Sequence, residues 1–414
     1  MEKPKIRFKG YQEDWEQRKL GELGSLKNGM NFSKEAMGVG YPFVNLQNIF
    51  GNNVIDVSDL GKAMASDSQL KDYNLINGDV LFVRSSVKLE GVGEAALVPQ
   101  TLENTTYSGF IIRFRDEYGL DNNFKRFVFG IDSVRNQIMS QATNSANKNI
   151  SQSVLENLEL AIPSKSEQQK IGAYFSNLDY LITLHQRKCE EMKTLKKYML
   201  QKMFPQNGQS VPQIRFSGFT EDWEQRKLGD FGKATGGTSI ESEFSEDGIY
   251  KVISIGSYSE NGVYNDQGIR AIKSDKTSNR VLNRNDLTMI LNDKTTSGNI
   301  IGRVLLIEES GIYVYNQRTE RIEINLDEYD PVFLYEMLNA PNIREKIIKQ
   351  AQGNTQIYVN WIAISLLEYM IPSKEEQVKI GEYLHSISNL ITLHQQKCDE
   401  LRNIKKFMLQ NMFI

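Results

Sequence analysis

Two long stretches of sequence decide the fold of this chain. Residues 162–204 read IPSKSEQQKIGAYFSNLDYLITLHQRKCEEMKTLKKYMLQKMF, and residues 371–413 read IPSKEEQVKIGEYLHSISNLITLHQQKCDELRNIKKFMLQNMF. They are identical at 26 of 43 positions, with an offset of 209 residues. Each begins with Ile-Pro and a serine that a glutamate follows three residues later, which is the pattern of a helix N-terminal capping box. Each stretch therefore predicts one long helix.

Apolar residues recur along both stretches with the four-then-three spacing of a coiled coil. About 38 helical residues at 1.5 Å each would span roughly 57 Å. We expect the two helices to be each other's antiparallel partner. The residues predicted to pair them are Ile171, Phe175, Leu178, Ile182, Ile380, Leu384, Ile387 and Ile391.

One polar pair lies within each predicted helix. His185 with Cys189, and His394 with Cys398, have the i,i+4 spacing that can bind Zn²⁺. Each histidine also occupies the apolar row, where a single polar residue sets the register of a coiled coil. We interpret both pairs as structural and expect no metal site.

A second repeat opens each half of the chain. Residues 6–21 (IRFKGYQEDWEQRKLG) and 214–229 (IRFSGFTEDWEQRKLG) agree at 13 of 16 positions. The segments between the repeats, 22–161 and 230–370, share only a skeleton that includes Asp79 with Asp286, Tyr107 with Tyr315, and Arg113 with Arg321. Diverged modules closed by nearly constant elements indicate one architecture with two specificities. An old duplication whose middle segments drifted freely is the alternative.

Both modules alternate short β-rich runs with turns of Gly, Asn, Asp and Ser. We predict an α+β fold class, with two α+β modules joined by two long antiparallel helices in pseudo-two-fold symmetry. The predicted boundaries are a first module at 1–161, a first helix at 162–205, a linker and second module at 206–370, and a second helix at 371–414.

The composition is that of an ordinary soluble protein, with 40% hydrophobic and 24% charged residues. The N-terminus is charged and has no signal-peptide pattern, and 18 apolar residues never run together. Two cysteines are too few for a disulfide framework. We therefore expect a cytoplasmic protein without a membrane partner.

The charge balance opposes a simple basic nucleic-acid binder. The formal net charge is -3. Residues 20–160 carry 12 Lys+Arg against 16 Asp+Glu, residues 228–369 carry 14 against 20, and residues 162–204 carry 8 against 4. Phosphate neutralisation supplies much of DNA affinity. A DNA-binding role would thus require clustered basic residues or phosphate contacts from partner subunits.

Catalytic motifs are missing from the sequence. No Walker A loop, HExxH motif or metal-spaced Cys/His cluster occurs. Gly91-Val92-Gly93-Glu94-Ala95-Ala96 fits the spacing of a dinucleotide-binding motif, but no helix signal follows it, so we interpret it as a turn between strands. We predict that the chain is not an enzyme and binds no cofactor. An enzyme with unrecognised catalytic residues is the alternative.

Four polar loops carry side chains suited to nucleic-acid contact. Arg and Lys read guanine, and Asn and Gln read adenine, through paired hydrogen bonds in the major groove. Two loops follow the strands that begin at Asp79 and Asp286, and two precede the long helices. The predicted DNA-binding residues are Arg84, Ser85, Ser86, Lys88, Asn144, Asn147, Lys148, Asn149, Asn292, Lys294, Thr295, Thr296, Gln352, Asn354 and Gln356. Ordinary solvated loops are the competing interpretation.

Together, the two repeated motifs resemble a known family. The Ile-Pro-Ser-Lys-x-Glu-Gln-x-x-Ile runs at 162–171 and 371–380 resemble the start of the helical regions of type I restriction-modification DNA specificity subunits. The Glu-Asp-Trp-Glu-Gln-Arg-Lys-Leu-Gly openings at 13–21 and 221–229 are similar to that family as well. The alternation of variable module and constant helix covers nearly the whole chain.

The resemblance implies a function and a set of partners. The modules would be target recognition domains, each of which reads one half of a bipartite, asymmetric site in double-stranded DNA. The helices would set the spacer and dock two adenine-methyltransferase subunits, which restriction/translocase subunits can join. S-adenosylmethionine would bind to the methyltransferase subunits and not to this chain. A coiled-coil scaffold with two protein- or carbohydrate-binding modules is the alternative.

Overall fold

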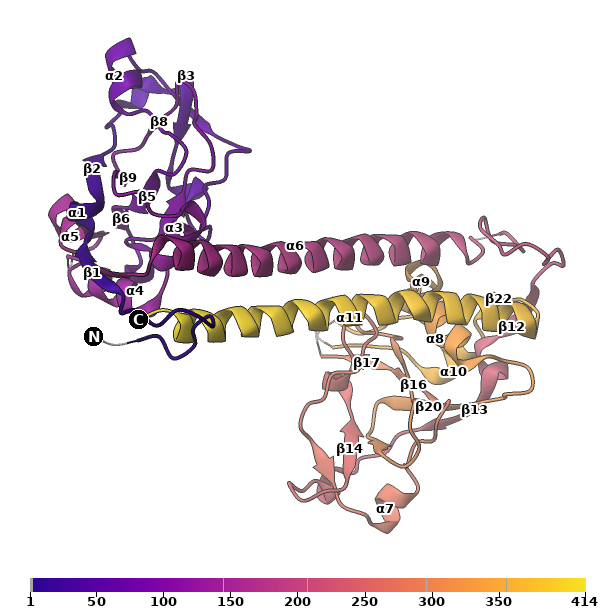
Figure 1. The fold of residues 1–414 in the computed structure, drawn as a ribbon. Helices are drawn as coiled ribbons and strands as arrows, with labels where there is room; N and C mark the ends of the chain where they lie inside the picture. The colour runs from indigo at the N-terminus through magenta and orange to yellow at the C-terminus, as the bar shows by residue number, and fades with distance from the viewer. Residues whose placement is uncertain (1–2, 144, 207, 295–296, 355) are drawn as a thin grey trace. The chain divides into compact units, whose positions relative to one another are not determined.

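The computed structural model describes residues 3–143, 145–206, 208–294, 297–354 and 356–414. The chain divides into two compact units. Unit 1 comprises residues 1–185 and 396–414, and unit 2 comprises residues 186–395. The two predicted long helices are confirmed as α6 (Lys165–Lys202, 38 residues) and α11 (Lys374–Met412, 39 residues), drawn in magenta and yellow in Figure 1. Each unit therefore combines one module with a segment of both long helices.

Unit 1 contains short strands and helices ahead of α6. Its strands are β1 (Glu16–Lys19), β2 (Gly24–Asn28), β3 (Met37–Val44), β4 (Gly61–Ala63), β5 (Val80–Val83), β6 (Ser85–Ser86), β7 (Ala95–Leu97), β8 (Thr106–Tyr107), β9 (Ile111–Asp116), β10 (Lys148–Asn149) and β11 (Glu159–Ile162). Its short helices are α1 (Leu20–Leu23), α2 (Asp67–Asp72), α3 (Asn122–Val128), α4 (Asp132–Ser140) and α5 (Gln152–Glu156).

Unit 2 repeats this series ahead of α11. Its strands are β12 (Glu224–Lys227), β13 (Gly232–Gly236), β14 (Tyr250–Ile253), β15 (Arg270–Ala271), β16 (Leu287–Ile290), β17 (Asn292–Asp293), β18 (Val304–Leu306), β19 (Tyr313–Tyr315), β20 (Thr319–Ile324), β21 (Ile357–Tyr358) and β22 (Glu368–Ile371). Its short helices are α7 (Asp275–Ser278), α8 (Pro331–Asn339), α9 (Pro341–Ile348) and α10 (Trp361–Ser365).

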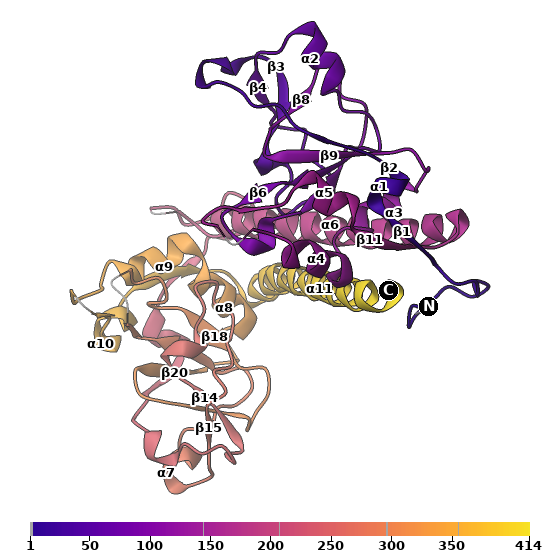
Figure 2. The same ribbon diagram turned by 90° about the vertical axis from the view of Figure 1, so that its left-hand side faces the viewer.

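The two modules have the same sheet topology. A four-stranded antiparallel sheet has the order β2-β9-β5-β7 in unit 1 and β13-β20-β16-β18 in unit 2. A three-stranded sheet, β4-β3-β8 or β15-β14-β19, contains one parallel pair. This smaller sheet lies at the end of each module that is farthest from the long helices, as Figures 1 and 2 both show. The predicted α+β class is confirmed.

The long helices take part in the core of each unit. In unit 1, the ring of Phe413, just beyond α11, lies 5.8 Å from that of Phe175 on α6. In unit 2, Phe204, just beyond α6, lies 5.8 Å from Phe333 on α8. The beginning of each long helix therefore packs with its own module, and the end of the other long helix completes that core.

Six of the eight predicted helix-pairing residues belong to these two cores. Ile171, Phe175, Leu178 and Ile182 are buried in the main cluster of unit 1, which also holds Leu401, Met412 and Phe413 of the α11 segment. In unit 2, Ile380 and Leu384 share a cluster with Met203 and Phe204. Ile387 is also buried, whereas Ile391 is partly exposed.

The repeated opening holds the start of each long helix. Nε and Nη2 of Arg7 donate to the two oxygens of the Glu167 carboxylate at 2.7 and 2.8 Å. Arg215 binds Glu376 in the same way and with the same two distances. The backbone N–H of Glu167 donates to Ser164 Oγ at 3.4 Å, which is one half of a capping box. The Glu167 carboxylate, which the capping-box pattern directs to the backbone, is instead taken by Arg7, 160 residues earlier. The capping-box prediction is therefore only half right.

One smaller prediction is also confirmed. Gly93, in the dinucleotide-like motif, has φ +69° in the turn before β7, as expected for a turn between strands. Across the residues that the structure describes, we find no helix long and apolar enough to cross a membrane.

Candidate nucleic-acid interface

The first pair of predicted loops comes together in unit 1. Strands β6 and β10 pair antiparallel, with Lys148 opposite Ser86 and Asn149 opposite Ser85. The N–H of Ile150 donates to the carbonyl of Arg84 at 3.0 Å and continues this ladder. Segments about 60 residues apart in the sequence therefore form one surface element.

The predicted residues of this element differ in exposure. Lys88 and Asn147 are exposed, whereas Arg84, Ser85, Ser86, Lys148 and Asn149 are partly buried. The Arg84 guanidinium donates to the carbonyl of Gly109 at 3.4 Å, and the amide of Asn149 donates to the carbonyl of Asn147 at 2.7 Å. Asn144 lies outside the described residues.

A hollow of about 490 Å³ lies beside this ladder, and we call it hollow 1. It contains four of the predicted residues and several apolar residues that the sequence analysis did not select. Val87 is 77% exposed and Phe110 is 58% exposed. Hollow 1 is lined by Leu46, Phe50, Ser85, Ser86, Val87, Lys88, Glu90, Gly91, Glu94, Phe110 and Asn147.

The second pair of predicted loops comes together in unit 2 in the same way. Strands β17 and β21 pair antiparallel, with Asn292 opposite Tyr358. The N–H of Val359 donates to the carbonyl of Leu291 at 2.9 Å, as Ile150 does to Arg84 in unit 1. The structure thus forms this ladder twice, once in each unit.

The exposed predicted residues of unit 2 include Lys294, Asn354 and Gln356. Gln352 is exposed as well, but its backbone pairs with Tyr358 and its side-chain oxygen accepts from the Tyr358 hydroxyl at 3.3 Å. Asn292 is partly buried in β17. Thr295 and Thr296 lie outside the described residues.

A hollow of about 320 Å³ in unit 2, which we call hollow 2, is lined by loop residues that include Ser254 after β14, Lys294 after β17 and Arg318 before β20. Of the predicted residues it contains Lys294, and it adds Arg318 and four other polar residues that the sequence analysis missed. Hollow 2 is lined by Glu241, Phe244, Ser254, Ile255, Gly256, Ile269, Lys294, Asn316, Gln317 and Arg318. A signal for Arg318 was present in the sequence, because it stands at the position of Phe110 in the other copy.

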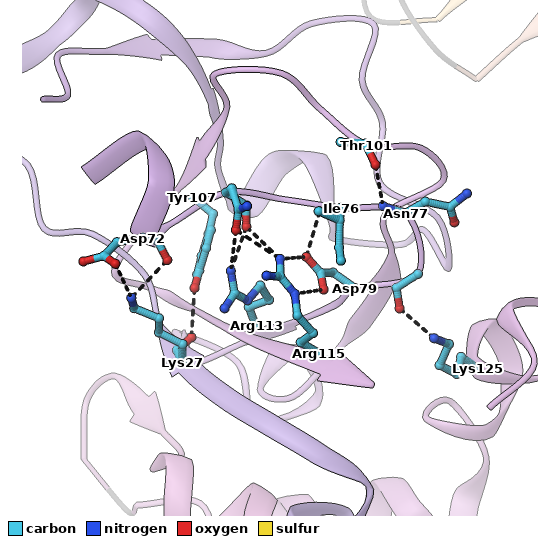
Figure 3. Close-up of polar contacts among 12 residues, drawn as sticks. Lys27, Asp72, Ile76, Asn77, Asp79, Thr101, Tyr107, Arg113, Arg115 and Lys125 are labelled. Atoms are coloured by element: carbon cyan, nitrogen blue, oxygen red, sulfur yellow. Dashed lines mark hydrogen bonds and ion pairs between the residues drawn. The ribbon is translucent and has the colours of Figure 1, made fainter. Parts of the chain in front are cut away.

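Many basic residues of the modules are engaged inside the fold. Figure 3 shows Arg115 bonded to both oxygens of Asp79 at 2.8 and 2.7 Å, while Arg113 donates to the carbonyl of Asn74. Lys125 is 3% exposed, donates to the carbonyl of Gly78, and pairs with Asp116 at 3.2 Å. These cations are engaged within the module, whereas Lys88, Lys294 and Arg318 are exposed.

The aspartates that align between the copies have different partners. Asp79 binds Arg115, whereas Asp286 binds Arg321, which the strand register matches to Arg113. Burial raises the pKa of Asp286, against hydrogen bonds from the Asn283 N–H and from Arg321. Sequence alignment alone would have assigned Arg113 the role that Arg115 has.

Glu320 and Arg344 of unit 2 are among the groups with strongly shifted pKa values. Burial raises the pKa of Glu320 to about 7, and the positive charge of Arg280 opposes that rise. Burial lowers the pKa of Arg344 to about 10. Arg344 is a structural group, since its guanidinium donates to the carbonyls of Ile301, Asn299 and Gly298.

The histidine and cysteine pairs form no metal site among the described residues, where no group of three or more His, Cys, Asp or Glu side chains is placed to hold an ion. Both cysteines are buried and form no disulfide. Cys189 Sγ lies 3.9 Å from the carbonyl oxygen of Ile391, and Cys398 Sγ lies 3.7 Å from that of Ile182. The thiols therefore pack against helix backbone.

Comparisons with known proteins identify the family. Residues 12–194 and 220–403 each match the family described as type I restriction modification DNA specificity domain. The chain is 26% identical to the MjaVIII type I restriction enzyme specificity subunit of Methanocaldococcus jannaschii over 277 residues, which are 65% of this chain and 64% of that relative's length. It is 29% identical to the EcoKI specificity subunit of Escherichia coli K12 over 151 residues, which are 36% of this chain and 32% of that protein.

A solved structure supports the same assignment of the fold. The S subunit of a type I restriction-modification system from M. genitalium superposes with a TM-score of 0.63 at 16% identity, and the match covers 100% of this chain and 99% of that one. The resemblance predicted from the two repeated motifs is confirmed. The chain belongs to the family of type I restriction-modification DNA specificity domains and carries two copies of that domain.

Proposed function

We propose that this chain is the specificity subunit of a cytoplasmic type I restriction-modification complex and reads a bipartite DNA target, one half-site per module. The observation that carries the proposal is the repeated ladder. β6–β10 and β17–β21 bring amide, hydroxyl and cationic side chains together at the same place in each module. Such side chains read base edges and bind phosphates. Because the same ladder carries different side chains in the two modules, the modules suit two different half-sites.

The long helices carry a surface suited to two copies of one protein partner. Large apolar side chains of α6 and α11 are exposed, among them Tyr198 at 49% and Phe407 at 56%, which occupy matching positions of the two copies. Exposed apolar patches mark protein–protein contacts. The other exposed apolar residues of these helices are Tyr180, Leu390, Leu393 and Ile404. We propose that one adenine-methyltransferase subunit docks on each copy.

Catalysis would then belong to the partners. S-adenosylmethionine is expected in the methyltransferase subunits, and restriction/translocase subunits would join them. In this scheme the chain supplies recognition and spacing without reacting groups of its own.

The test compares the chain alone with the chain plus its methyltransferase. A gel shift over random duplex DNA should give one bound motif of two half-sites when both proteins are present. The purified chain with S-adenosylmethionine and DNA should transfer no methyl group. If the complex shows no sequence preference, the scaffold alternative is correct. Methylation by the chain alone would support the enzyme alternative.

A further inference from the structure

Phe110 and Arg318 occupy equivalent positions in the two units. The N–H of Arg84 donates to the carbonyl of Phe110 at 2.8 Å, and the N–H of Leu291 donates to the carbonyl of Arg318 at 3.0 Å. Each residue comes directly before the strand, β9 or β20, that lies next to β5 or β16. Each also lines the hollow of its own unit. The two recognition surfaces therefore differ in chemistry at one matched point.

Arg318 has an unusual backbone. Its φ is +68°, in the left-handed region that side chains with a Cβ avoid. Among the described residues, the other non-glycine positions with positive φ are Asn104 and Asn285, and asparagine tolerates this region well. Glycine would relieve the strain at 318, so the arginine side chain itself has a use. Strained residues of this kind concentrate at functional sites.

The side chain of Arg318 is available for a ligand. It is exposed, and among the residues that the structure describes its guanidinium has no hydrogen-bond or ion-pair partner. The lining of hollow 2 is mixed in charge, because it holds the Glu241 carboxylate as well as the cations Lys294 and Arg318. Glu241 lies in the same hollow, and its carboxylate accepts from Gln317 at 3.1 Å and from Asn316 at 3.4 Å. A carboxylate beside the arginine repels a phosphate, whereas it can accept from the cytosine amino group of a G·C pair.

The matched position in unit 1 has the opposite chemistry. Phe110 and Val87 are apolar and largely exposed in hollow 1. Neither side chain can donate a hydrogen bond to a base. In the major groove, an apolar side chain recognises the thymine methyl group.

Building on the proposed function, we propose that this position determines specificity in both modules. Arg318 reads a guanine in the half-site of unit 2 by paired hydrogen bonds to O6 and N7. Phe110, together with Val87, reads a thymine methyl group in the half-site of unit 1.

The experiment uses the full chain in complex with its methyltransferase subunits and maps methylated sites over a whole genome. The first variant is Arg318→Gly, which removes the side chain and suits the backbone. It should lower the methylation of sites that have guanine at one position of one half-site roughly 5- to 160-fold, so that sites with other bases at that position are methylated nearly equally. This is the change expected for loss of a paired arginine–guanine contact. Asn285→Gly is the matched control, because it relaxes a positive φ outside hollow 2 and should leave the motif unchanged.

The second variant, Phe110→Ala, should relax a thymine position in the opposite half-site, and Phe110→Arg should shift that position towards guanine. The proposal is overturned if Arg318→Gly lowers methylation equally over all sequences, which would mean a phosphate contact. It is also overturned if the two variants alter the same half-site, or if the motif does not change. A wild-type complex that methylates no split target would refute the proposed function itself, and this outcome is seen before any variant is made.

Discussion

The two units share their scaffold contacts and differ in their recognition surfaces. Arg7 and Arg215 hold Glu167 and Glu376 at identical distances, and each glutamate is almost fully buried. At the reading position, by contrast, unit 1 has Phe110 and unit 2 has Arg318. The contacts that begin each long helix are thus preserved, while the loops beside the ladders vary in chemistry.

One lysine shows how the modules vary on a constant helix. Lys405 of α11 pairs with Asp179 of α6 at 2.5 Å in unit 1. Lys196, its equivalent in the other copy, pairs with Glu336 of α8 at 2.8 Å in unit 2. Both copies of the repeat have the lysine, but its acidic partner lies on a long helix in unit 1 and on a helix of the module in unit 2. A module can therefore change its sequence provided that its unit still supplies an acidic partner.

The largest expected effect comes from cutting the chain near Gln206, because a dimer of the first half-chain would contain two identical units. The half-chain of residues 1–206 loses Phe413, whose ring lies 6.3 Å from Trp15 and 5.8 Å from Phe124. The end of α6 has nearly the same sequence, so Phe204 of a second copy can fill that place. We expect a homodimer that, with methyltransferase present, modifies a palindrome of one half-site. Light scattering and methylation mapping measure both results.

Phe204→Ala in the same half-chain is the control, and it should weaken the dimer because it leaves that place empty. A folded, monomeric half-chain would contradict the shared-core interpretation, since it would show that the first module needs no segment from another helix.

The fold could be predicted from sequence because its signals are repeated and local. Pro163 and Ser164 mark the start of α6 within a residue, and the heptad rows predict its length. The division of each long helix between two units was not predictable, because the heptad spacing continues past residue 185, where His185 interrupts one row at a single position. Phe110 and Arg318 were missed because their exposure depends on strand register, which single residues do not reveal. The partner of Glu167 was missed because Arg7 is remote in sequence.

The next effect concerns the distance between half-sites. Since α6 and α11 both run from one unit into the other, a longer spacer needs both helices lengthened. Four residues inserted between His185 and Gln186, and four between Gln395 and Gln396, add about 6 Å and rotate each helix by about 400°. The apolar rows then nearly realign, and we expect the same half-sites with a spacer longer by one or two base pairs.

Methylation mapping reads the spacer directly. Insertion between Leu195 and Met199 is an informative control, because it displaces Phe204 from Trp223 and Phe333 in the core of unit 2 and should destabilise that unit. An active double-insertion complex with an unchanged spacer would show that the helices do not measure the gap.

The repeated ion pair should matter equally in both units. Arg7→Met leaves the Glu167 carboxylate, 1% exposed, without its cation, and Arg215→Met does the same to Glu376. Breaking a buried pair costs about 3–5 kcal/mol. Urea unfolding should show similar losses of unfolding free energy in both variants. Arg18→Met, which removes an exposed pair with Glu16, should cost far less than either of these substitutions. Unequal losses for Arg7 and Arg215 would mean that the scaffold contacts are not equivalent.

The smallest effect is a pH-dependent difference between the modules. Strand register matches Glu320 of unit 2 to Ile112 of unit 1. The pKa of Glu320 is raised from its ordinary 4.5 to about 7. Between these values the unfolded chain has lost the proton and the folded chain retains it, so stability falls as pH rises from 4.5 to 7. One pKa unit corresponds to about 1.36 kcal/mol, which bounds the loss at about 3 kcal/mol.

Glu320→Gln should remove this loss, because glutamine stays neutral at every pH. Near pH 4.5 the variant and the wild type should unfold at the same urea concentration, and above pH 7 the variant should be more stable by about 2–3 kcal/mol. The exposed residue Glu309 of unit 2 provides the control, since Glu309→Gln makes the same substitution at the surface of the same unit. A Glu320→Gln profile parallel to that of the wild type would mean that the carboxylate is ionised in the fold at neutral pH. The modules would then differ at this position in side-chain size and polarity and not in proton binding.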